Sequence, residues 1–247
     1  MRIAFFVHCT SECTGRGIAL RTQTVIARED LLQIASWAQH LTERELRRAC
    51  EGIVCKNFSK GSYVCHRGDR LDSWTGVATG LLKVSAFSKT GKAISLTGIR
   101  SGGWVGEGAM LKDEPRQYDL VAMRDMQLAL MNQVTFFWLY ETSVGFNHFL
   151  VRQFNERLGQ FIALLEHERT MDAPARLART VAWLFNPVLY PEPGAHLDLS
   201  QEEIGLLSGL SRQSANKALK ILERENLLSI ERGGITVLDL PRLARYD

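Results

Sequence analysis

Apolar residues near the C-terminal end of the chain recur at the spacing of amphipathic helices. Between positions 204 and 222 they fall mostly three or four residues apart, on one face of each of two helices: Ile204, Leu206, Leu207, Ala215, Ala218, Leu219 and Leu222. Gly209 is placed to end the first helix and Ser211 to cap the second. Ser200 and Glu203 have the spacing of a capping box. The pattern predicts a helix, a short turn and a second helix.

The second predicted helix carries polar residues on its first turns. Arg212, Gln213, Asn216 and Lys217 lie away from the apolar face and follow directly on Ser211. In a helix-turn-helix, side chains at these positions of the second helix reach base edges in the major groove of DNA. An ordinary helical hairpin whose polar face is only solvated has the same spacing. Both interpretations stay open on this pattern alone.

The segment after the second helix favours DNA binding. Residues 227–238 form two short runs of apolar and β-branched residues around Gly233 and Gly234, which predicts a β-hairpin. A hairpin directly after a helix-turn-helix makes a winged module. Arg232, at the turn, is placed to contact a DNA phosphate, which fixes the register of a protein on the duplex.

The first half of the chain has a different pattern. Glycines separate short alternating or β-branched runs between positions 52 and 108, such as SYVCH and LLKVSAF. This pattern predicts an antiparallel β-barrel or roll, in which residues 88–93 (SKTGKA) form a hairpin. Ahead of it, an amphipathic helix between about Leu31 and Ala49 is predicted, with Thr42 and Glu45 as a capping box.

A long amphipathic helix is predicted from about residue 145 to 169. Its apolar stripe consists of Leu150, Phe154, Leu158, Phe161 and Leu165. The stripe packs either wholly on its own β-domain or partly against the same helix of a second chain as a short coiled coil. We favour the dimer, because a paired winged module reads two half-sites related by a two-fold axis. Asp172 and Pro174 then predict a hinge and the start of the next helix.

Length and charge bear on the number of domains and on where DNA would bind. A chain of 247 residues with 45% hydrophobic content is long enough for two domains, each with a core. The net charge is only +3, and residues 172–247 carry nine Arg and Lys against ten Asp and Glu. The basic signal is therefore local: Arg212, Lys217, Lys220 and Arg224 lie along the second helix beside Glu223 and Glu225, as phosphate contact requires.

The sequence gives little support for a disulfide framework, a metal site or a catalytic site. The five cysteines, Cys9, Cys13, Cys50, Cys55 and Cys65, are odd in number and lack the spacing of a disulfide framework or a four-ligand metal site, so reduced thiols and no metal or other cofactor are expected. No catalytic residues are assigned, because neither a nucleophile–base set nor a phosphate loop is present.

Residues 1–28 are expected to be a poorly specified extension, without the apolar run of a signal peptide. No stretch approaches the roughly 18 apolar residues that span a membrane. A cytoplasmic protein is expected.

Together these segments resemble the Crp/Fnr superfamily of bacterial transcription regulators. The resemblance covers about residues 41–240 and rests on KGSYVCHRGD, GLLKVSAFSKTGK, GGWVGEGAML, DAPARLARTVAWL and LSQEEIGLLSGLSRQSANKALKILERENLL. It implies an α+β protein: after the extension, an antiparallel β-roll sensor domain resembling cyclic-nucleotide-binding domains (residues 29–135), a dimerisation helix (136–170) and a C-terminal winged helix-turn-helix (171–247). The implied partners are a palindromic double-stranded DNA site, a second copy of the chain and RNA polymerase.

The resemblance assigns DNA contacts to residues of the winged module. These are Ser211, Arg212, Gln213, Asn216, Lys217, Lys220 and Arg232. Many members of the superfamily have Glu at the position of Gln213, where it accepts a hydrogen bond from cytosine N4. Gln pairs bidentately with adenine N6 and N7 instead, while Arg212 is suited to guanine O6 and N7. A different half-site from that of the glutamate-bearing members is expected.

The resemblance also identifies an effector pocket. Gly106, Glu107 and Arg116 match the residues that hold ribose and cyclic phosphate in cAMP-binding members. Gln117 and Tyr118, however, replace a small hydroxyl residue and usually Ala. We expect Tyr118 to narrow the phosphate position.

The adenine end of the pocket departs from the family pattern too. Phe161 and Ile162 stand where cAMP binders present hydroxyls to adenine, and neither side chain can hydrogen-bond a base. We therefore expect no cAMP response and an effector that is unknown or absent. A regulator that responds to cAMP or cGMP is the alternative. In a further interpretation Gly106 and Glu107 form a structural turn, with Arg116 in an ion pair. The spacing of iron-sulfur and haem members is not matched.

Functions of other classes remain as alternatives. A β-roll that binds a ligand or a protein, without DNA readout by the C-terminal module, would show neither sequence preference nor a steep salt dependence in DNA binding. An enzyme is the least favoured of the three.

Overall fold

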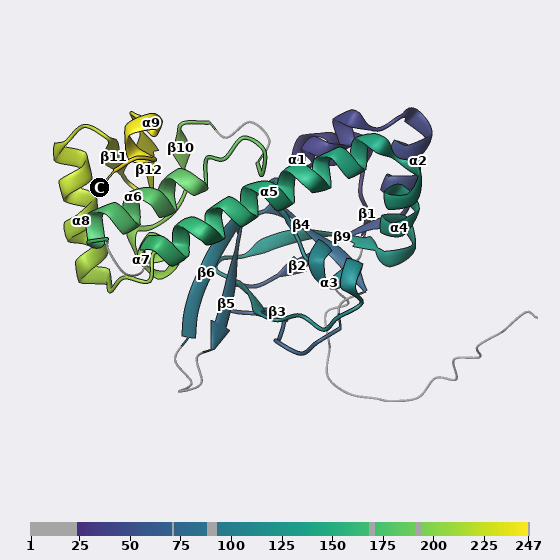
Figure 1. The fold of residues 1–247 in the computed structure, drawn as a ribbon, viewed down its shortest axis with the longest axis horizontal. Coiled ribbons are helices and arrows are strands. Elements are labelled where there is room, and N and C mark those ends of the chain that lie inside the picture. The colour runs from purple at the N-terminus through teal and green to yellow at the C-terminus, as the bar shows by residue number, and fades with distance from the viewer. Residues whose placement is uncertain (1–23, 71, 88–92, 168–170, 191–193, 247) are drawn as a thin grey trace, which may run out of the picture.

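The molecule is a β-roll with a helical cap, a long helix across it, and a smaller winged-helix unit at the far end (Figure 1). The computed structural model describes residues 24–70, 72–87, 93–167, 171–190 and 194–246. Both the predicted α+β class and the predicted architecture are confirmed. The predicted hairpin turn at 88–92 and the first 23 residues lie outside the described residues.

The β-roll consists of two antiparallel sheets packed face to face. One has the order β1-β2-β9-β4-β7, formed by Thr24–Val25, Ile53–Phe58, Met126–Asn132, Ser73–Thr79 and Trp104–Val105. The other has the order β3-β8-β5-β6, formed by Tyr63–Cys65, Asp119–Ala122, Leu81–Phe87 and Ala93–Arg100. Side chains that alternate inward along the strands, such as Val77, Leu82, Leu120 and Leu128, form the core between the sheets.

Helices cover one end of the roll and enclose an aromatic core. They are α1 (Arg28–Ile34), a 3₁₀ helix (Ser36–His40), α2 (Glu43–Glu51), α3 (Glu107–Lys112), α4 (Gln133–Thr142) and α5 (Val144–His167). Trp37, Trp74, Trp104 and Phe146 meet in this core, with Trp74 and Trp104 ring centroids 4.5 Å apart. The capping box predicted for Thr42 is present at the start of α2.

The N-terminal part joins the fold earlier than the predicted boundary at residue 28. Thr24–Val25 pairs with Val54 and Cys55 of β2, and Ile26 and Leu31 are buried in the aromatic core. The region predicted as one dimerisation helix, 136–170, contains the end of α4 and all of α5. Ser143 separates the two helices, because its backbone is extended and its hydroxyl accepts a hydrogen bond from the Phe146 amide to start α5.

The C-terminal unit is a winged helix-turn-helix, as predicted. It comprises α6 (Ala173–Trp183), β10 (His196–Leu197), α7 (Gln201–Leu207), α8 (Arg212–Arg224), β11 (Leu228–Glu231), β12 (Gly234–Val237) and α9 (Leu240–Leu243). The predicted caps are all formed: Asp172 caps α6, Ser200 and Glu203 make a capping box on α7, and Ser211 caps α8. Local hydrogen bonds therefore set the start of each helix of the module.

The winged unit packs directly on the β-roll. Arg124, which follows β8, donates to Asp198 at 2.8 Å and to Glu203 at 2.7 Å. Leu207 of α7 rests against Gly98 of β6, where a Cβ would lie 2.9 Å from the leucine methyl carbons. The sequence pattern gave no indication of these contacts. They fix the first helix of the helix-turn-helix relative to the roll.

A second set of contacts joins the loop after α6 to β6. The Tyr190 hydroxyl donates to the Gly98 carbonyl at 3.1 Å, and the Tyr190 ring is buried among β-roll residues. Arg100 donates to the Leu184 carbonyl at 3.2 Å and stacks against the rings of Phe185 and Tyr190. The two units thus share one buried interface.

Glu203 has two partners with different structural roles. Its carboxylate accepts hydrogen bonds from Ser200, which closes the capping box, and from Arg124 of the β-roll. Burial alone would raise the pKa of this carboxyl, but the hydrogen bonds from Arg124 and Ser200 outweigh burial and hold the pKa below its ordinary value. The charged form of Glu203 therefore stabilises the folded protein.

Replacing Glu203 by glutamine should lower the free energy of unfolding at pH 7 by about 1 to 2 kcal/mol, because the cap and the charged pair are both weakened. Since the folded-state pKa is lowered, the contribution is complete above the ordinary value of 4.5 and is lost as the pH falls through the lowered value. Urea unfolding at pH 7 and at acidic pH measures this difference. Glu202→Gln, at the exposed neighbouring position, is the control, and equal stability of both variants at pH 7 would contradict the role of Glu203.

Candidate nucleic-acid interface and effector cavity

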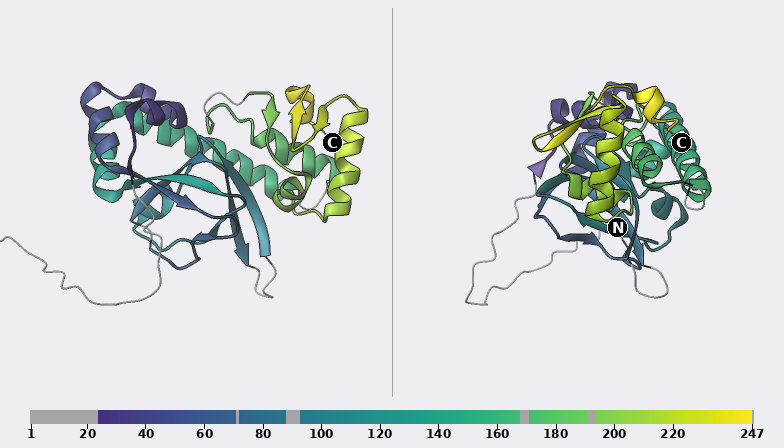
Figure 2. Two further views of the ribbon diagram at one scale, coloured as in Figure 1. Left: turned by 180° about the vertical axis from the view of Figure 1, so that it is seen from behind. Right: turned by 90° about the vertical axis from the view of Figure 1, so that its left-hand side faces the viewer.

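The recognition helix α8 lies at the outer end of the molecule (Figure 2, right). It carries a row of polar residues. Ala215, Ala218, Leu219 and Leu222 are buried in the core of the winged unit, so the opposite side of the helix faces outward. Of the residues predicted to contact DNA, five on this helix and its cap are exposed: Ser211, Arg212, Gln213, Lys217 and Lys220. The exposed residues carry three cations at the positions where phosphates and base edges meet a recognition helix.

Asn216 differs from the other predicted DNA contacts. It is half-buried, and its Oδ1 is buried with no hydrogen-bond partner among the described residues. The residue lies between the exposed row and the buried stripe, because its neighbours on the helix surface are the buried Leu219, three positions on, and the exposed Lys220, four positions on. Its carbonyl oxygen faces the protein, so only the amide end is available for a contact outside it.

The wing is formed as predicted and is tied to the recognition helix. Arg232 is exposed at the turn between β11 and β12, where Glu231 pairs with Gly234. A contact that the sequence pattern missed holds the wing in place: the Ile230 amide donates to Glu223 Oε1 at 2.8 Å. Glu223, one of the acidic residues beside the basic residues of α8, therefore holds the wing against the recognition helix.

A cavity of about 370 Å³ lies between the β-roll and α5. Its lining residues are Val84, Leu96, Thr97, Val105, Gly106, Glu107, Gly108, Ala109, Lys112, Glu114, Pro115, Gln117, Tyr118, Phe154, Arg157, Leu158 and Phe161. Five of the predicted effector residues are among them, namely Gly106, Glu107, Gln117, Tyr118 and Phe161. Arg116 and Ile162 are not, and the apolar side chains of the list make the cavity largely apolar.

Arg116 is turned into the protein beneath the cavity. Only 1% of the residue is exposed, and its guanidinium donates to the Ser73 carbonyl at 3.0 Å and to the Tyr118 hydroxyl at 3.4 Å. Gly106 has φ of 105°, and a Cβ on it would overlap this guanidinium. Both the backbone conformation and the lack of space therefore require glycine at this position. Both acceptors of the Arg116 guanidinium are neutral oxygens. Among the described residues, Arg116 therefore forms neither the expected free phosphate clamp nor the alternative ion pair.

Glu107 is engaged by other residues of the protein. The residue is 4% exposed, accepts a hydrogen bond from Trp74 Nε1 at 3.2 Å, and lies 3.6 Å from Arg157 Nε. Arg157 also donates to the Trp104 carbonyl at 2.6 Å. The sequence pattern did not single out Arg157. This buried pair connects α3 to α5 and to the aromatic core, which supports the structural-turn interpretation of Gly106 and Glu107.

Burial favours the neutral forms of the Tyr118 hydroxyl and of three cysteine thiols. Burial raises the pKa of the Tyr118 hydroxyl, against the opposing effect of Arg116. Burial also raises the pKa of the Cys65 thiol to about 11, and the pKa values of Cys50 and Cys55 are raised by the same cause. Cys50, Cys55 and Cys65 are free thiols, while Cys9 and Cys13 lie outside the described residues.

Two other kinds of feature are absent from the part of the chain that the structure describes. Within the described ranges, no three His, Cys, Asp or Glu residues are grouped as a metal ion would require. In the same part of the chain, no helix combines the length and the apolar character needed to cross a membrane.

Glu107→Gln should lower the free energy of unfolding by about 1 to 3 kcal/mol, because Arg157 then keeps a buried charge with no carboxylate partner. Chemical unfolding followed by tryptophan fluorescence measures the loss. Glu114→Gln removes a carboxylate from the exposed rim of the same cavity and is the matched control. A Glu107→Gln protein as stable as the control would show that the buried pair contributes nothing to folding.

Comparison with known proteins gives the same two-part organisation. Residues 55–143 match the family model of the cyclic nucleotide-binding domain, and residues 175–246 match that of the Crp-like helix-turn-helix domain. The cAMP-activated global transcriptional regulator CRP of Pasteurella multocida is 25% identical over 178 residues, 70% of this chain and 84% of that protein.

Solved structures share the fold. FixK2 from Bradyrhizobium japonicum aligns with a TM-score of 0.63 at 16% identity, over 79% of this chain and 97% of that one. The c-di-GMP responsive regulator CLP of Xanthomonas campestris aligns with a TM-score of 0.55 at 22% identity, over 79% and 99% of the two chains. With both family models matched in the order of its two folded units, the chain belongs to the Crp/Fnr superfamily of DNA-binding transcription regulators.

Proposed function

We propose that the protein is a homodimeric regulator that reads a palindromic DNA site and does not respond to cAMP. The observation that carries the proposal is the exposed polar row of α8, with Arg212, Gln213 and Lys217 on its first turns and a buried stripe behind them. Arg212 would read guanine, Gln213 would read adenine, and Lys220 and Arg232 would contact phosphates. RNA polymerase stays a predicted partner.

The dimer is supported by the exposed side of α5. Val151, Phe154, Leu158 and Phe161 follow one another at spacings of three, four and three residues, the spacing of a coiled-coil seam. Each of them is between 38% and 66% exposed. Four large apolar side chains in one row on a single helix favour burial against a second copy of that helix.

The absence of a cAMP response is supported by the cavity. The cation expected to hold the cyclic phosphate, Arg116, donates to Ser73 and Tyr118. The carboxylate expected to hold ribose, Glu107, is bound to Trp74 and paired with Arg157. Phe161 offers the base only apolar contact. Binding of cAMP would have to break these hydrogen bonds, and Phe161 would offer the purine no hydrogen bond in return. The relatives named above are described as cAMP-activated or c-di-GMP responsive, so effector chemistry varies among similar folds.

Arg212→Ala should weaken binding to the specific site by about 1 to 3 kcal/mol and flatten base preference at one position, because a bidentate base contact is lost. Lys220→Ala should weaken specific and non-specific binding alike and reduce the salt slope by about 1, because it contacts the backbone. Fluorescence anisotropy with a selected duplex and a scrambled duplex, over a range of salt concentrations, separates the two. Equal loss of base preference in both variants would refute this division of roles.

Leu158→Glu should lower the dimer content, because a charge on the helix seam is desolvated when two helices meet. DNA affinity should fall with it, while the circular dichroism of the β-roll is retained. Val134→Glu places the same charge on the exposed face of α4 and is the control. Analytical ultracentrifugation measures the dimer content. An unchanged dimer content in Leu158→Glu would show that the stripe on α5 is not the dimer seam.

Addition of cAMP or cGMP should leave DNA affinity unchanged. An effector acts only through differential binding to the active and inactive states, and the two groups expected to hold the nucleotide, Glu107 and Arg116, are already bound within the protein. Calorimetric titration with each nucleotide, followed by DNA binding at millimolar nucleotide, tests this. Micromolar binding coupled to a tenfold or greater rise in DNA affinity, about 1.4 kcal/mol, would restore the cyclic-nucleotide sensor.

A further inference from the structure

The cavity beside α5 has the size of a small-molecule site but no free charge. Its volume of about 370 Å³ is within the range of ligand pockets in proteins. The charged lining residues are Glu107 and Glu114 against Lys112 and Arg157, so their charges cancel. Each of these groups has a partner of opposite sign: Glu107 lies 3.6 Å from Arg157, and Lys112 lies 3.9 Å from Glu114.

Apolar side chains make up most of the rest of the wall. Val84 and Leu96 come from the sheet, Val105 and Ala109 from the segment around α3, and Phe154, Leu158 and Phe161 from α5. The Tyr118 ring also lines the cavity, while its hydroxyl meets Arg116 beneath it. A ligand would exchange water for aromatic and aliphatic contacts on three sides, which favours an apolar molecule and disfavours an ion.

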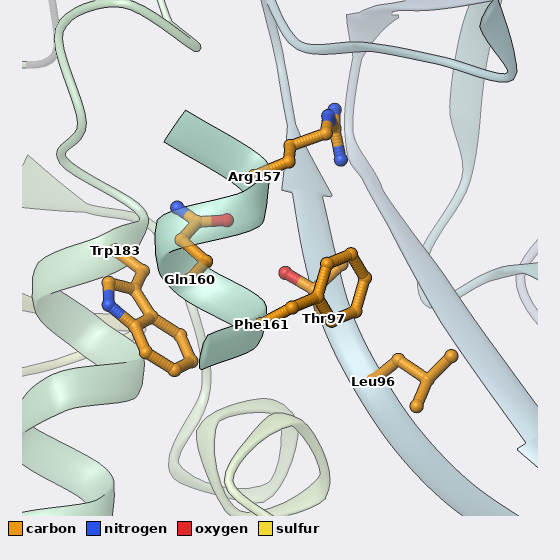
Figure 3. A pocket seen from close by; sticks show the side chains of 6 residues that line it. All are labelled: Leu96, Thr97, Arg157, Gln160, Phe161 and Trp183. Atoms are coloured by element: carbon orange, nitrogen blue, oxygen red, sulfur yellow. The ribbon is translucent and has the colours of Figure 1, made fainter. Parts of the chain in front are cut away.

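The wall formed by α5 also leads toward the winged unit. Leu96, Thr97, Arg157 and Phe161 line both this cavity and a small neighbouring gap, which is closed by Gln160 and by Trp183 of α6 (Figure 3). Figure 3 shows the Phe161 ring over Thr97 of β6 and the Trp183 indole approaching the same turn of α5 from α6. Helix α6 shares the core of the winged unit with α8 through Val181, Ala182 and Leu219. A change in the position of Phe161 therefore reaches the helix that supports the recognition helix.

We propose that the effector pocket expected from the family takes, in this chain, a compact, uncharged, largely apolar molecule of roughly the size of two to three aromatic rings, which acts on DNA affinity through Phe161 and Trp183. The inference rests on the proposed function as a DNA-binding regulator. In the proposed dimer, Phe154, Leu158 and Phe161 lie at the border between seam and cavity, so the pairing of two chains covers the open side of the site. Seam and effector contact the same residues of α5.

Titration of the full-length protein with N-phenylnaphthylamine, a neutral probe that fluoresces in apolar surroundings, tests the site. Saturable binding of one probe per chain is expected. Leu96→Trp fills the cavity from β6 and should weaken binding at least tenfold. Gly108→Leu fills it from α3, where a Cβ meets no atom within 4 Å, and should do the same. Val134→Trp adds an equal ring on α4, away from the cavity, and should bind like the wild type.

DNA binding by the same samples separates this inference from the proposed function. Saturating probe should change the affinity of the wild type for its selected duplex at least fivefold and leave Gly108→Leu unchanged. Probe binding that both filling variants retain, or DNA affinity that the bound probe does not alter, would overturn the proposal. A wild-type sample that binds DNA but no probe contradicts the effector site alone. A sample that binds no duplex contradicts the proposed function instead.

Discussion

Helix α5 has two apolar faces, and the rest of the molecule depends on how both are covered. One face carries Phe146, Phe149 and Leu150 into the aromatic core around Trp37 and Trp74, which fixes the helix on the roll. The other face presents Leu158 and its neighbours at seam spacing to the outside. A single roll cannot bury both sides of one helix. In the proposed dimer a second chain covers the remaining face, and a two-fold axis along α5 would place two recognition helices in one assembly.

The same helix supports the proposal that the effector residues of the family do not form a cyclic-nucleotide site in this chain. Arg157 of α5 pairs with Glu107 and donates to the Trp104 carbonyl, which uses the carboxylate that a ribose would need. Tyr118 provides the acceptor that helps to hold Arg116 inside the roll. With Glu107 and Arg116 engaged within the chain, the space between roll and helix keeps largely apolar walls. In the proposed function, the retained residues of the family motif stabilise the protein.

The features that the sequence predicted well are those with a local signal. The helix-turn-helix follows from apolar residues at helical spacing and from hydroxyl residues at the helix starts, and the caps at Ser200 and Ser211 are present because each hydrogen bond closes within three residues. The hairpin of the wing follows from β-branched runs around two glycines. These interactions are encoded in short stretches, so no knowledge of the tertiary structure is needed to expect them.

Features that depend on distant partners were not predictable. Arg124 and Glu203 are 79 residues apart, and nothing near either residue indicates that the β-roll holds the first helix of the winged unit. Arg116 was expected to face a ligand because of its place in a motif, whereas its direction is set by Ser73 and Tyr118. Asn216 was assigned to the DNA-reading row, but the packing of α8 turns its carbonyl oxygen inward. In each case the tertiary environment decides where a polar side chain points.

Selection of bound sites from randomised duplex DNA tests DNA reading and dimerisation together. A recovered site depends both on the exposed polar row of α8 and on the pairing of two chains through α5. A two-fold symmetric motif is expected, with half-sites spaced by about one helical turn, close to 34 Å, or a multiple of it, and with guanine and adenine contacts in each half. Recovery of unrelated sequences, or of a single half-site without symmetry, would contradict the proposed function.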